Sequence, residues 1–238
     1  MALHNVFGDT GAGKSVFLTR TVTKIYYERG QELLERSRRI IEEENKKRSV
    51  KLTPPDRVPI YCNFKIKIPN PDGSIYEPYL IKGSEIGIGK KYKKLYPGAV
   101  IIIDEAQNEF NSKGDLPRAV SAFFEKNRHA DFDIWLASQR PILINKDIRD
   151  LSRHFIQIYK LEKTVAHFGV VCGLKWYCRE FDSRADVDEY VELSKHGKGE
   201  IVSYRETVYK STGEVLEYYD TKSYLSEYLP AEGANYEN

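Results

Sequence analysis

The segment GDTGAGKS, residues 8–15, spaces its glycines, lysine and serine as a phosphate-binding loop does. Glycines let successive backbone N–H groups turn into one concavity, which attracts an anion. In such a loop Lys14 reaches the β- and γ-phosphates of a nucleotide, and Ser15 is a ligand of Mg²⁺. The predicted cofactor-binding residues are Gly8, Asp9, Thr10, Gly11, Ala12, Gly13, Lys14, Ser15 and Val16.

A glycine-rich turn that fits this pattern by chance is the alternative, and the flanking residues argue against it. The segment ALHNVF, residues 2–7, can form a short strand. After the loop, Leu18, Val22 and Ile25 recur at the spacing of a helix. A helix that begins at Lys14 points the positive end of its dipole at the phosphates. Strand, loop and helix are the setting that a phosphate-binding loop requires.

The second chemical motif is AVIIIDEAQ, residues 99–107. Its β-branched run is typical of a strand buried in a parallel sheet, and Asp104 follows at the carboxyl end, where ligand sites of α/β proteins lie. We expect Asp104 to hold Mg²⁺ through a water molecule and Glu105 to polarise the attacking water as general base. The alternative is a strand that ends in an acidic turn, which the phosphate-binding loop disfavours. The predicted metal ligands are therefore Ser15 and Asp104.

Two further polar side chains are candidates for the reaction. Gln139 follows an apolar strand and is predicted to contact the γ-phosphate and the attacking water, although an exposed strand end is the alternative. Arg128 ends the preceding helix. It either complements the negative end of the helix dipole or serves as an arginine finger for a neighbouring subunit in a ring. Other candidates for the finger are Arg140, Arg149 and Arg153.

The nucleobase that the protein prefers is predicted from the absence of a guanine-binding motif. A guanine-specific protein carries Asn-Lys-x-Asp, whereas INKDI, residues 144–148, lacks the intervening residue. We therefore expect ATP as the nucleotide, with Mg²⁺.

Composition describes a globular protein. The 238 residues are 41% hydrophobic and 30% charged, with a net charge of +2, so no global basic field indicates a nucleic-acid binder. Three cysteines without CxxC spacing are typical of reduced thiols in a cytosolic protein. No signal peptide precedes the phosphate-binding loop, and the longest apolar stretch, residues 165–178, is too short for a membrane span. We expect a soluble protein.

Strand and helix patterns alternate along the first two thirds of the chain and predict a three-layer α/β fold with a mainly parallel central sheet. Helical patterns follow the phosphate-binding loop and cover residues 114–129 and 145–154. The remaining strands are predicted at residues 60–66, 133–139 and 155–163.

Domain organisation is predicted as one α/β core with additions. The core spans residues 1–165 and contains a charged helical insertion at about residues 30–57, after a first helix that runs towards Gly30. The insertion has a narrow apolar seam and is either a surface excursion or a partner-facing arm. Residues 166–238 form a β-rich extension of the same domain and a tail, with strand-like segments that include EVLEYYDT, residues 214–221.

One basic and aromatic cluster, GKKYKKLYPG at residues 89–98, has two readings. Its lysines can follow a DNA backbone while its tyrosines stack on bases, or the segment is a solvated loop.

Taken together, these motifs resemble the zonular occludens toxin family, whose phage members are filamentous-phage assembly ATPases. The resemblance rests on the phosphate-binding loop, on IIIDEAQNEF, and on the stretch from FFEKNRH to DLSRHF. YCNFKI, which contains Asn63, and YYDTKSY are also similar to family segments. The likeness covers roughly residues 1–29, 58–66 and 97–225.

The resemblance implies a RecA-like ATPase domain on the cytoplasmic side of the inner membrane, which extrudes single-stranded phage DNA as coat protein replaces its packaging partner. It implies the roles given above for Lys14, Ser15, Asp104 and Glu105, and the sensor position for Gln139. Expected partners are phage or viral DNA, coat or assembly proteins, other copies of the chain in a ring, and the inner membrane. The insertion at 31–57 has no match in the family, and the expected membrane span is not seen.

Three functions remain open on these grounds. The first is a motor ATPase for phage assembly and DNA export. The second is a soluble ATPase that packages a viral genome into a capsid. The third is a nucleotide-gated scaffold, against which Glu105 argues because a protein that only binds nucleotide has no use for a general base.

Overall fold

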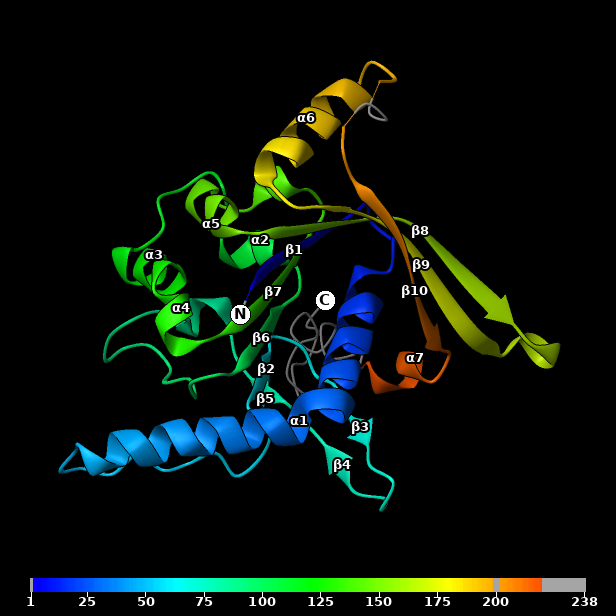
Figure 1. The fold of residues 1–238 in the computed structure, drawn as a ribbon. Coiled ribbons are helices and arrows are strands. Elements are labelled where there is room, and N and C mark those ends of the chain that lie inside the picture. The colour runs from blue at the N-terminus through cyan, green and yellow to red at the C-terminus, as the bar shows by residue number, and fades with distance from the viewer. Residues whose placement is uncertain (1, 199–201, 220–238) are drawn as a thin grey trace, which may run out of the picture.

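The computed structural model describes residues 2–198 and 202–219 (Figure 1). An eight-stranded sheet forms its centre, with the spatial order β10-β9-β8-β1-β7-β6-β2-β5. The strands from β8 to β5 run parallel, whereas β9 and β10 are antiparallel to their neighbours. The strands of this sheet are Leu3–Phe7 (β1), Ile60–Cys62 (β2), Tyr79–Leu80 (β5), Val100–Ile103 (β6), Asp133–Ser138 (β7), His154–Val165 (β8), Val171–Phe181 (β9) and Arg205–Thr212 (β10).

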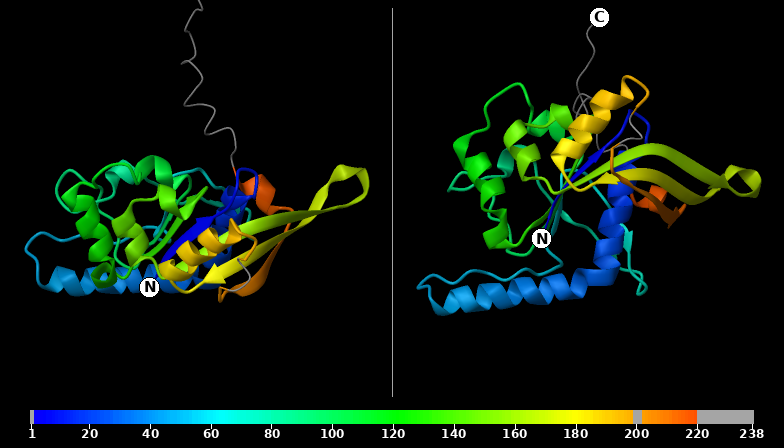
Figure 2. Two further views of the ribbon diagram at one scale, coloured as in Figure 1. Left: turned by 90° about the horizontal axis from the view of Figure 1, so that it is seen from above. Right: turned by 45° about the horizontal axis from the view of Figure 1, so that its top comes forward.

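Helices cover both faces of the sheet and complete three layers (Figure 2). The long helix α1 packs on one face over an apolar core that it shares with β1, β2 and β6. Shorter helices enclose a second core on the other face. The helices are Lys14–Lys46 (α1), Ala106–Glu109 (α2), Arg118–Glu125 (α3), Asn127–Ala130 (α4), Lys146–Leu151 (α5), Arg184–Ser194 (α6) and Val215–Tyr218 (α7). Three 3₁₀ turns lie at Gly83–Glu85, Pro141–Leu143 and His167–Gly169, and Ile68–Pro69 (β3) pairs with Ile75–Tyr76 (β4).

Helix α1 does not end near Gly30, as its sequence predicts, but continues to Lys46. In Figure 1 its second half turns away from the sheet as a long arm. Gly30 is tolerated inside the helix because Val58 packs directly against it, so close that a Cβ atom would lie 3.3 Å from Cγ2 of Val58. Leu33 and Ile41 are buried along the arm, because the returning chain covers them. Part of the apolar seam, Leu33 and Ile41, is therefore buried within the chain itself.

The predicted β-rich region contains both strands and helices. β8 and β9 form a long hairpin that projects from the body (Figure 1). The segment at 214–221, predicted as a strand, instead contains the helix α7. Its chain reverses at Gly213, whose Cβ position would lie 1.7 Å from the carbonyl oxygen of Val171, and Val215 is then buried against α1. The predicted boundary at residue 165 falls at the tip of the hairpin, and the division into core and extension stays a prediction.

The tail beyond Tyr219, which the sequence assigns to the same domain, lies outside the described residues. Within residues 2–198 and 202–219, no helix combines the length and the apolar character that a membrane crossing requires.

Candidate nucleotide-binding site

The phosphate-binding loop, residues 8–15, connects the carboxyl end of β1 to the start of α1. Gly11 and Gly13 have φ values of +84° and +82°, in the left-handed region that favours glycine. At Gly13 a Cβ atom would lie 2.6 Å from Cδ2 of Leu161, so a larger residue would also require the Leu161 side chain to shift. The loop therefore needs glycine chiefly for the left-handed backbone of its turn.

Lys14 lies at the first turn of α1 with only 6% of its surface exposed. Its ammonium group donates to the carbonyl oxygens of Gly8, at 2.9 Å, and Asp9, at 3.2 Å. No carboxylate among the described residues forms an ion pair with it. A buried cation that only backbone carbonyls satisfy favours an anion at this place.

The two predicted metal ligands, Ser15 and Asp104, lie side by side. Asp104 follows β6 and is 1% exposed. Burial raises the pKa of Asp104, while hydrogen bonds from the Ser15 hydroxyl and the Glu105 N–H act in the opposite direction. The described residues hold no group of three or more His, Cys, Asp or Glu side chains that could bind a metal. A pair of one hydroxyl and one carboxylate fits Mg²⁺, which takes its remaining ligands from phosphate oxygens and water.

Asn63 fixes the backbone of Asp104 from the neighbouring strand. Its Nδ2 donates to the Asp104 carbonyl oxygen at 2.8 Å, and its Oδ1 accepts from the Asp104 N–H at 2.7 Å. These two hydrogen bonds continue the pairing of β2 with β6 by one more step. They hold Asp104 in place at the carboxyl end of β6.

Glu105 has a left-handed backbone, with φ of +48°, at the start of α2. That conformation costs a residue other than glycine on the order of 1–2 kcal/mol. It turns the carboxylate into the pocket, where the side-chain amide of Gln107 donates to it. The other polar atom of that amide, Oε1 of Gln107, is buried without a hydrogen-bond partner among the described residues. Gln107 was not predicted as a site residue, although it lies within the motif.

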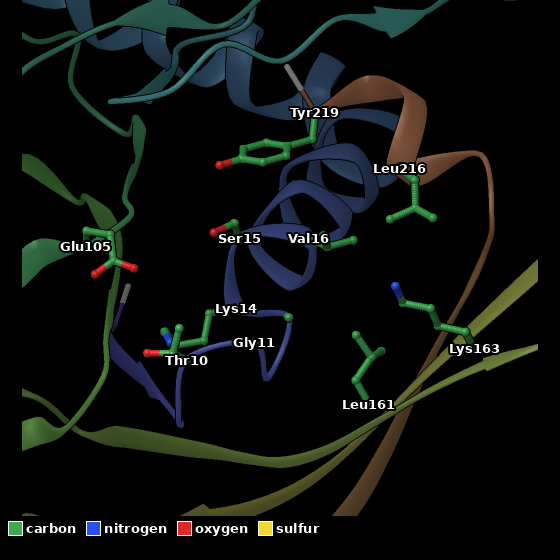
Figure 3. A pocket seen from close by; sticks show the side chains of 11 residues that line it. Thr10, Gly11, Lys14, Ser15, Val16, Glu105, Leu161, Lys163, Leu216 and Tyr219 are labelled. Carbon is green, nitrogen blue, oxygen red and sulfur yellow. The ribbon is translucent and has the colours of Figure 1, made fainter. Parts of the chain in front are cut away.

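A pocket opens between these groups (Figure 3). Its volume is about 320 Å³. The sequence motifs supply the loop and Glu105, whereas four lining residues come from the hairpin and from the segment around α7, which sequence reasoning missed. The lining residues are Thr10, Gly11, Gly13, Lys14, Ser15, Val16, Glu105, Leu161, Lys163, Leu216 and Tyr219.

Gln139 lies directly after β7, between the phosphate-binding loop and Asp104 in the strand order. The register pairs Phe7 with Ser138, so Gln139 stands level with the start of the loop. Its side chain is exposed and does not line the pocket. The sensor role stays a prediction.

Arg128 belongs to α4, which precedes β7. The Gly98 N–H donates to the carbonyl oxygen of Ala130 at 2.8 Å, which places α4 at the amino ends of β6 and β7. That edge of the sheet is opposite to the phosphate-binding loop. Among the other candidate fingers, Arg149 is buried and donates from Nε to the carbonyl oxygen of Ile144 at 3.0 Å.

The tyrosines of the basic cluster at 89–98 do not form a stacking surface. Tyr92 is 9% exposed and packs with Tyr96 into the core beneath the short helices. The four lysines of the cluster are exposed. Of the two readings, a solvated basic loop agrees with these positions, and base stacking by Tyr92 does not.

Trp176 of β9 is a further residue that sequence reasoning missed. It is fully buried, and its indole N–H donates to the carbonyl oxygen of Gly13 at 3.2 Å. Its ring also meets Phe17 of α1 edge to face. No local signal marks this contact, because it joins residues 163 positions apart.

The strand order β8-β1-β7-β6-β2, with helices on both faces of the sheet, defines a three-layer α/β fold with a mainly parallel central sheet. A family model, Zonular occludens toxin (Zot), matches residues 79–211, more than half of the chain. The chain therefore belongs to the Zot family, which confirms both the predicted fold class and the resemblance.

Two solved structures illustrate the similarity. The N-terminal domain of zonular occludens toxin from Neisseria meningitidis aligns with a TM-score of 0.52 and 16% identity, over 92% of this chain and 98% of that chain. The genome packaging NTPase B204 from Sulfolobus turreted icosahedral virus 2, in complex with ATP-gammaS, aligns with a TM-score of 0.43 and 13% identity, over 86% of this chain and 96% of that chain. At such identities the likeness concerns the fold. A comparison with curated proteins gave no match.

Proposed function

We propose that this protein is an ATP-hydrolysing motor of phage or virus assembly, which drives the extrusion or export of DNA. The proposal of hydrolysis rests on the Glu105 carboxylate, which lines the same pocket as Lys14 and Ser15. Membership of the Zot family supports the assembly role.

In this proposal the loop binds the triphosphate, Asp104 helps to hold the metal ion, and Glu105 activates the attacking water. Lys14 neutralises the β- and γ-phosphates, while Ser15 and Asp104 hold Mg²⁺. When bound, the ion supplies charge neutralisation at the transferred phosphoryl group. Glu105 accepts a hydrogen bond from the attacking water and takes its proton, and the Gln107 amide orients that carboxylate.

The partners belong to the same proposal. They are phage or viral DNA, coat or assembly proteins, and other copies of the chain in a ring. The proposed location is the host cytoplasm, at the cytoplasmic face of the inner membrane. The exposed lysines at 89–98 offer a backbone contact for DNA.

The test measures ATP hydrolysis with and without DNA for wild type, Glu105→Gln and Lys14→Ala. Glu105→Gln should bind ATP and Mg²⁺ normally but turn over very slowly, because Ser15 and Asp104 are unchanged. Lys14→Ala should lose binding, because the phosphates lose their compensating charge. Stimulation by single-stranded DNA supports export, whereas stimulation by double-stranded DNA alone supports packaging into a capsid. A Glu105→Gln protein that keeps its kcat would remove the assignment of the base.

A further inference from the structure

The pocket has two ends of different chemistry, and the strand order explains why. Glu105 follows β6, which lies two strands from β1 on one side. Leu161 and Lys163 belong to β8, which adjoins β1 on the other side. In Figure 3 the glutamate and the pair from β8 accordingly lie on opposite sides of Lys14. In the proposed function, the triphosphate and the water that attacks it occupy the side with Glu105.

The side away from Glu105 is lined mostly by carbon. Besides the side chain of Lys163, three aliphatic side chains and one aromatic ring line this part of the pocket, and all four are half-buried. They come from the start of α1, from β8 and from the segment around α7. These residues are Val16, Leu161, Leu216 and Tyr219.

Tyr219 is held in place by the segment that follows β2. Its backbone forms a bridge with Ile66, and its ring meets Phe64 edge to face, with the centroids 5.6 Å apart. The carbonyl oxygen of the preceding residue, Tyr218, accepts from the Lys67 N–H at 3.0 Å. Figure 3 shows the Tyr219 ring above Ser15, with its hydroxyl group pointing towards the side on which Glu105 lies. The residue is therefore fixed by contacts outside the pocket, and it also lines the pocket.

We propose that this carbon-lined end, formed by Val16, Leu161, Leu216 and Tyr219, binds the base of the nucleoside triphosphate, with the Tyr219 ring as its stacking partner. A nucleobase has flat apolar faces, and stacking on an aromatic side chain contributes substantially to its binding. The proposal rests on the proposed function, because it needs a nucleotide whose phosphates occupy the loop. It makes the hairpin and α7 part of the nucleotide site, although both lie outside the sequence motifs.

The experiment compares two probes, Mg²⁺-ATP and Mg²⁺-tripolyphosphate, by equilibrium binding. Both carry the triphosphate and only ATP carries a base. Tyr219→Leu and Leu216→Ala should each weaken ATP binding about tenfold and leave tripolyphosphate affinity unchanged. The matched control is Tyr218→Leu, because Tyr218 neighbours Tyr219 but lines a different groove. This control should bind both probes as the wild type does.

Each other outcome is informative. Equal weakening of both probes, or no weakening of either, would overturn the proposed base site, and thermal melting identifies a variant that fails to fold. The conservative Tyr219→Phe variant keeps the ring and should bind ATP normally. If wild type binds tripolyphosphate as tightly as ATP, the base makes no contact and this inference fails while the phosphate site stands. If wild type binds neither probe, the proposed function fails with it.

Discussion

Asp104 is a carboxylate buried at the edge of the sheet, and it combines two demands that oppose each other. Burial disfavours its charged form and raises its pKa, although the hydroxyl of Ser15 and the N–H of Glu105 donate to it. The charge is what Mg²⁺ requires. The residue that suits the metal therefore weakens the fold when the metal is absent.

This conflict predicts the behaviour of Asp104→Asn. The amide keeps the shape and an acceptor oxygen but carries no charge, so the nucleotide-free variant should be more stable than wild type at neutral pH. A gain of about 1 kcal/mol would raise the Tm by roughly 2–4 °C. Mg²⁺-dependent ATP binding should be lost. Thermal melting without nucleotide and equilibrium binding measure the two effects.

The pH dependence of this gain has a definite sign. The folded protein holds a proton on Asp104 more tightly than the unfolded chain does, so ionisation of the group destabilises the fold as pH rises. The advantage of Asp104→Asn should therefore grow as pH rises above the ordinary carboxyl pKa of 3.8. It should vanish as pH falls below the ordinary carboxyl pKa of 3.8, where the carboxyl is protonated in both states. An advantage that persists unchanged in acid would contradict this account.

At the scale of elements, the β8–β9 hairpin supports the phosphate-binding loop as well as extending the sheet. Leu161 and Trp176 are cross-strand partners in the hairpin, and both contact Gly13. The contact is a hydrogen bond from the indole N–H and close packing of the leucine. A change in the position of the hairpin is therefore coupled to the backbone of the loop at residues 8–15.

Trp176→Phe tests this support. It removes the hydrogen bond to the Gly13 carbonyl and part of a fully buried ring, so ATP affinity should fall several-fold and stability by about 1–3 kcal/mol. Chemical denaturation and equilibrium binding measure these losses. The matched control is Trp135→Phe, because the buried N–H of Trp135 has no hydrogen-bond partner among the described residues and its ring stacks on His4 at the other end of the strands.

The control variant should keep the ATP affinity of wild type. It also leaves Trp176 as the only tryptophan, so indole fluorescence then reports directly on the loop. Equal losses of ATP affinity in the two variants would mean that Trp176 has no particular role at the loop.

At the scale of the whole molecule, the carboxyl ends and the amino ends of the parallel strands are separated by the length of the strands. The phosphate-binding loop lies at the carboxyl edge and α4, with Arg128, at the amino edge. β7 has six residues and spans roughly 20 Å at about 3.3 Å per residue. Helix α4 is therefore separated from the phosphate-binding loop of its own chain by about the length of this strand.

If Arg128 acts as a finger, it therefore acts on a neighbouring copy in the proposed ring. Arg128→Ala should bind ATP normally yet lose about 10³-fold or more in kcat, since an arginine finger supplied in trans is worth that much. Titration of this variant into wild type should lower hydrolysis more steeply than dilution does. Specific activity that is independent of protein concentration, with linear loss on mixing, would show that each chain works alone.

The sequence by itself determined the parts of this protein whose chemistry is local. GDTGAGKS directly follows a strand, and AVIIIDEAQ contains one, so turn and functional groups lie within a few residues of a strand end in both motifs. Their placement at the carboxyl ends of parallel strands follows from these patterns. The three-layer architecture was predicted for the same reason, because strand and helix periods are set by neighbouring residues.

Only the tertiary structure decided what lies around those motifs. Tyr92 lies in a lysine-rich segment, as a base-stacking tyrosine would, yet the fold buries its side chain. The strand predicted at 214–221 contains a helix, which follows the close approach at Gly213 and packs on α1. Leu161, Trp176 and Tyr219 reach the nucleotide site from distant parts of the chain. Such contacts depend on which surfaces meet when the sheet closes, and no residue spacing encodes them.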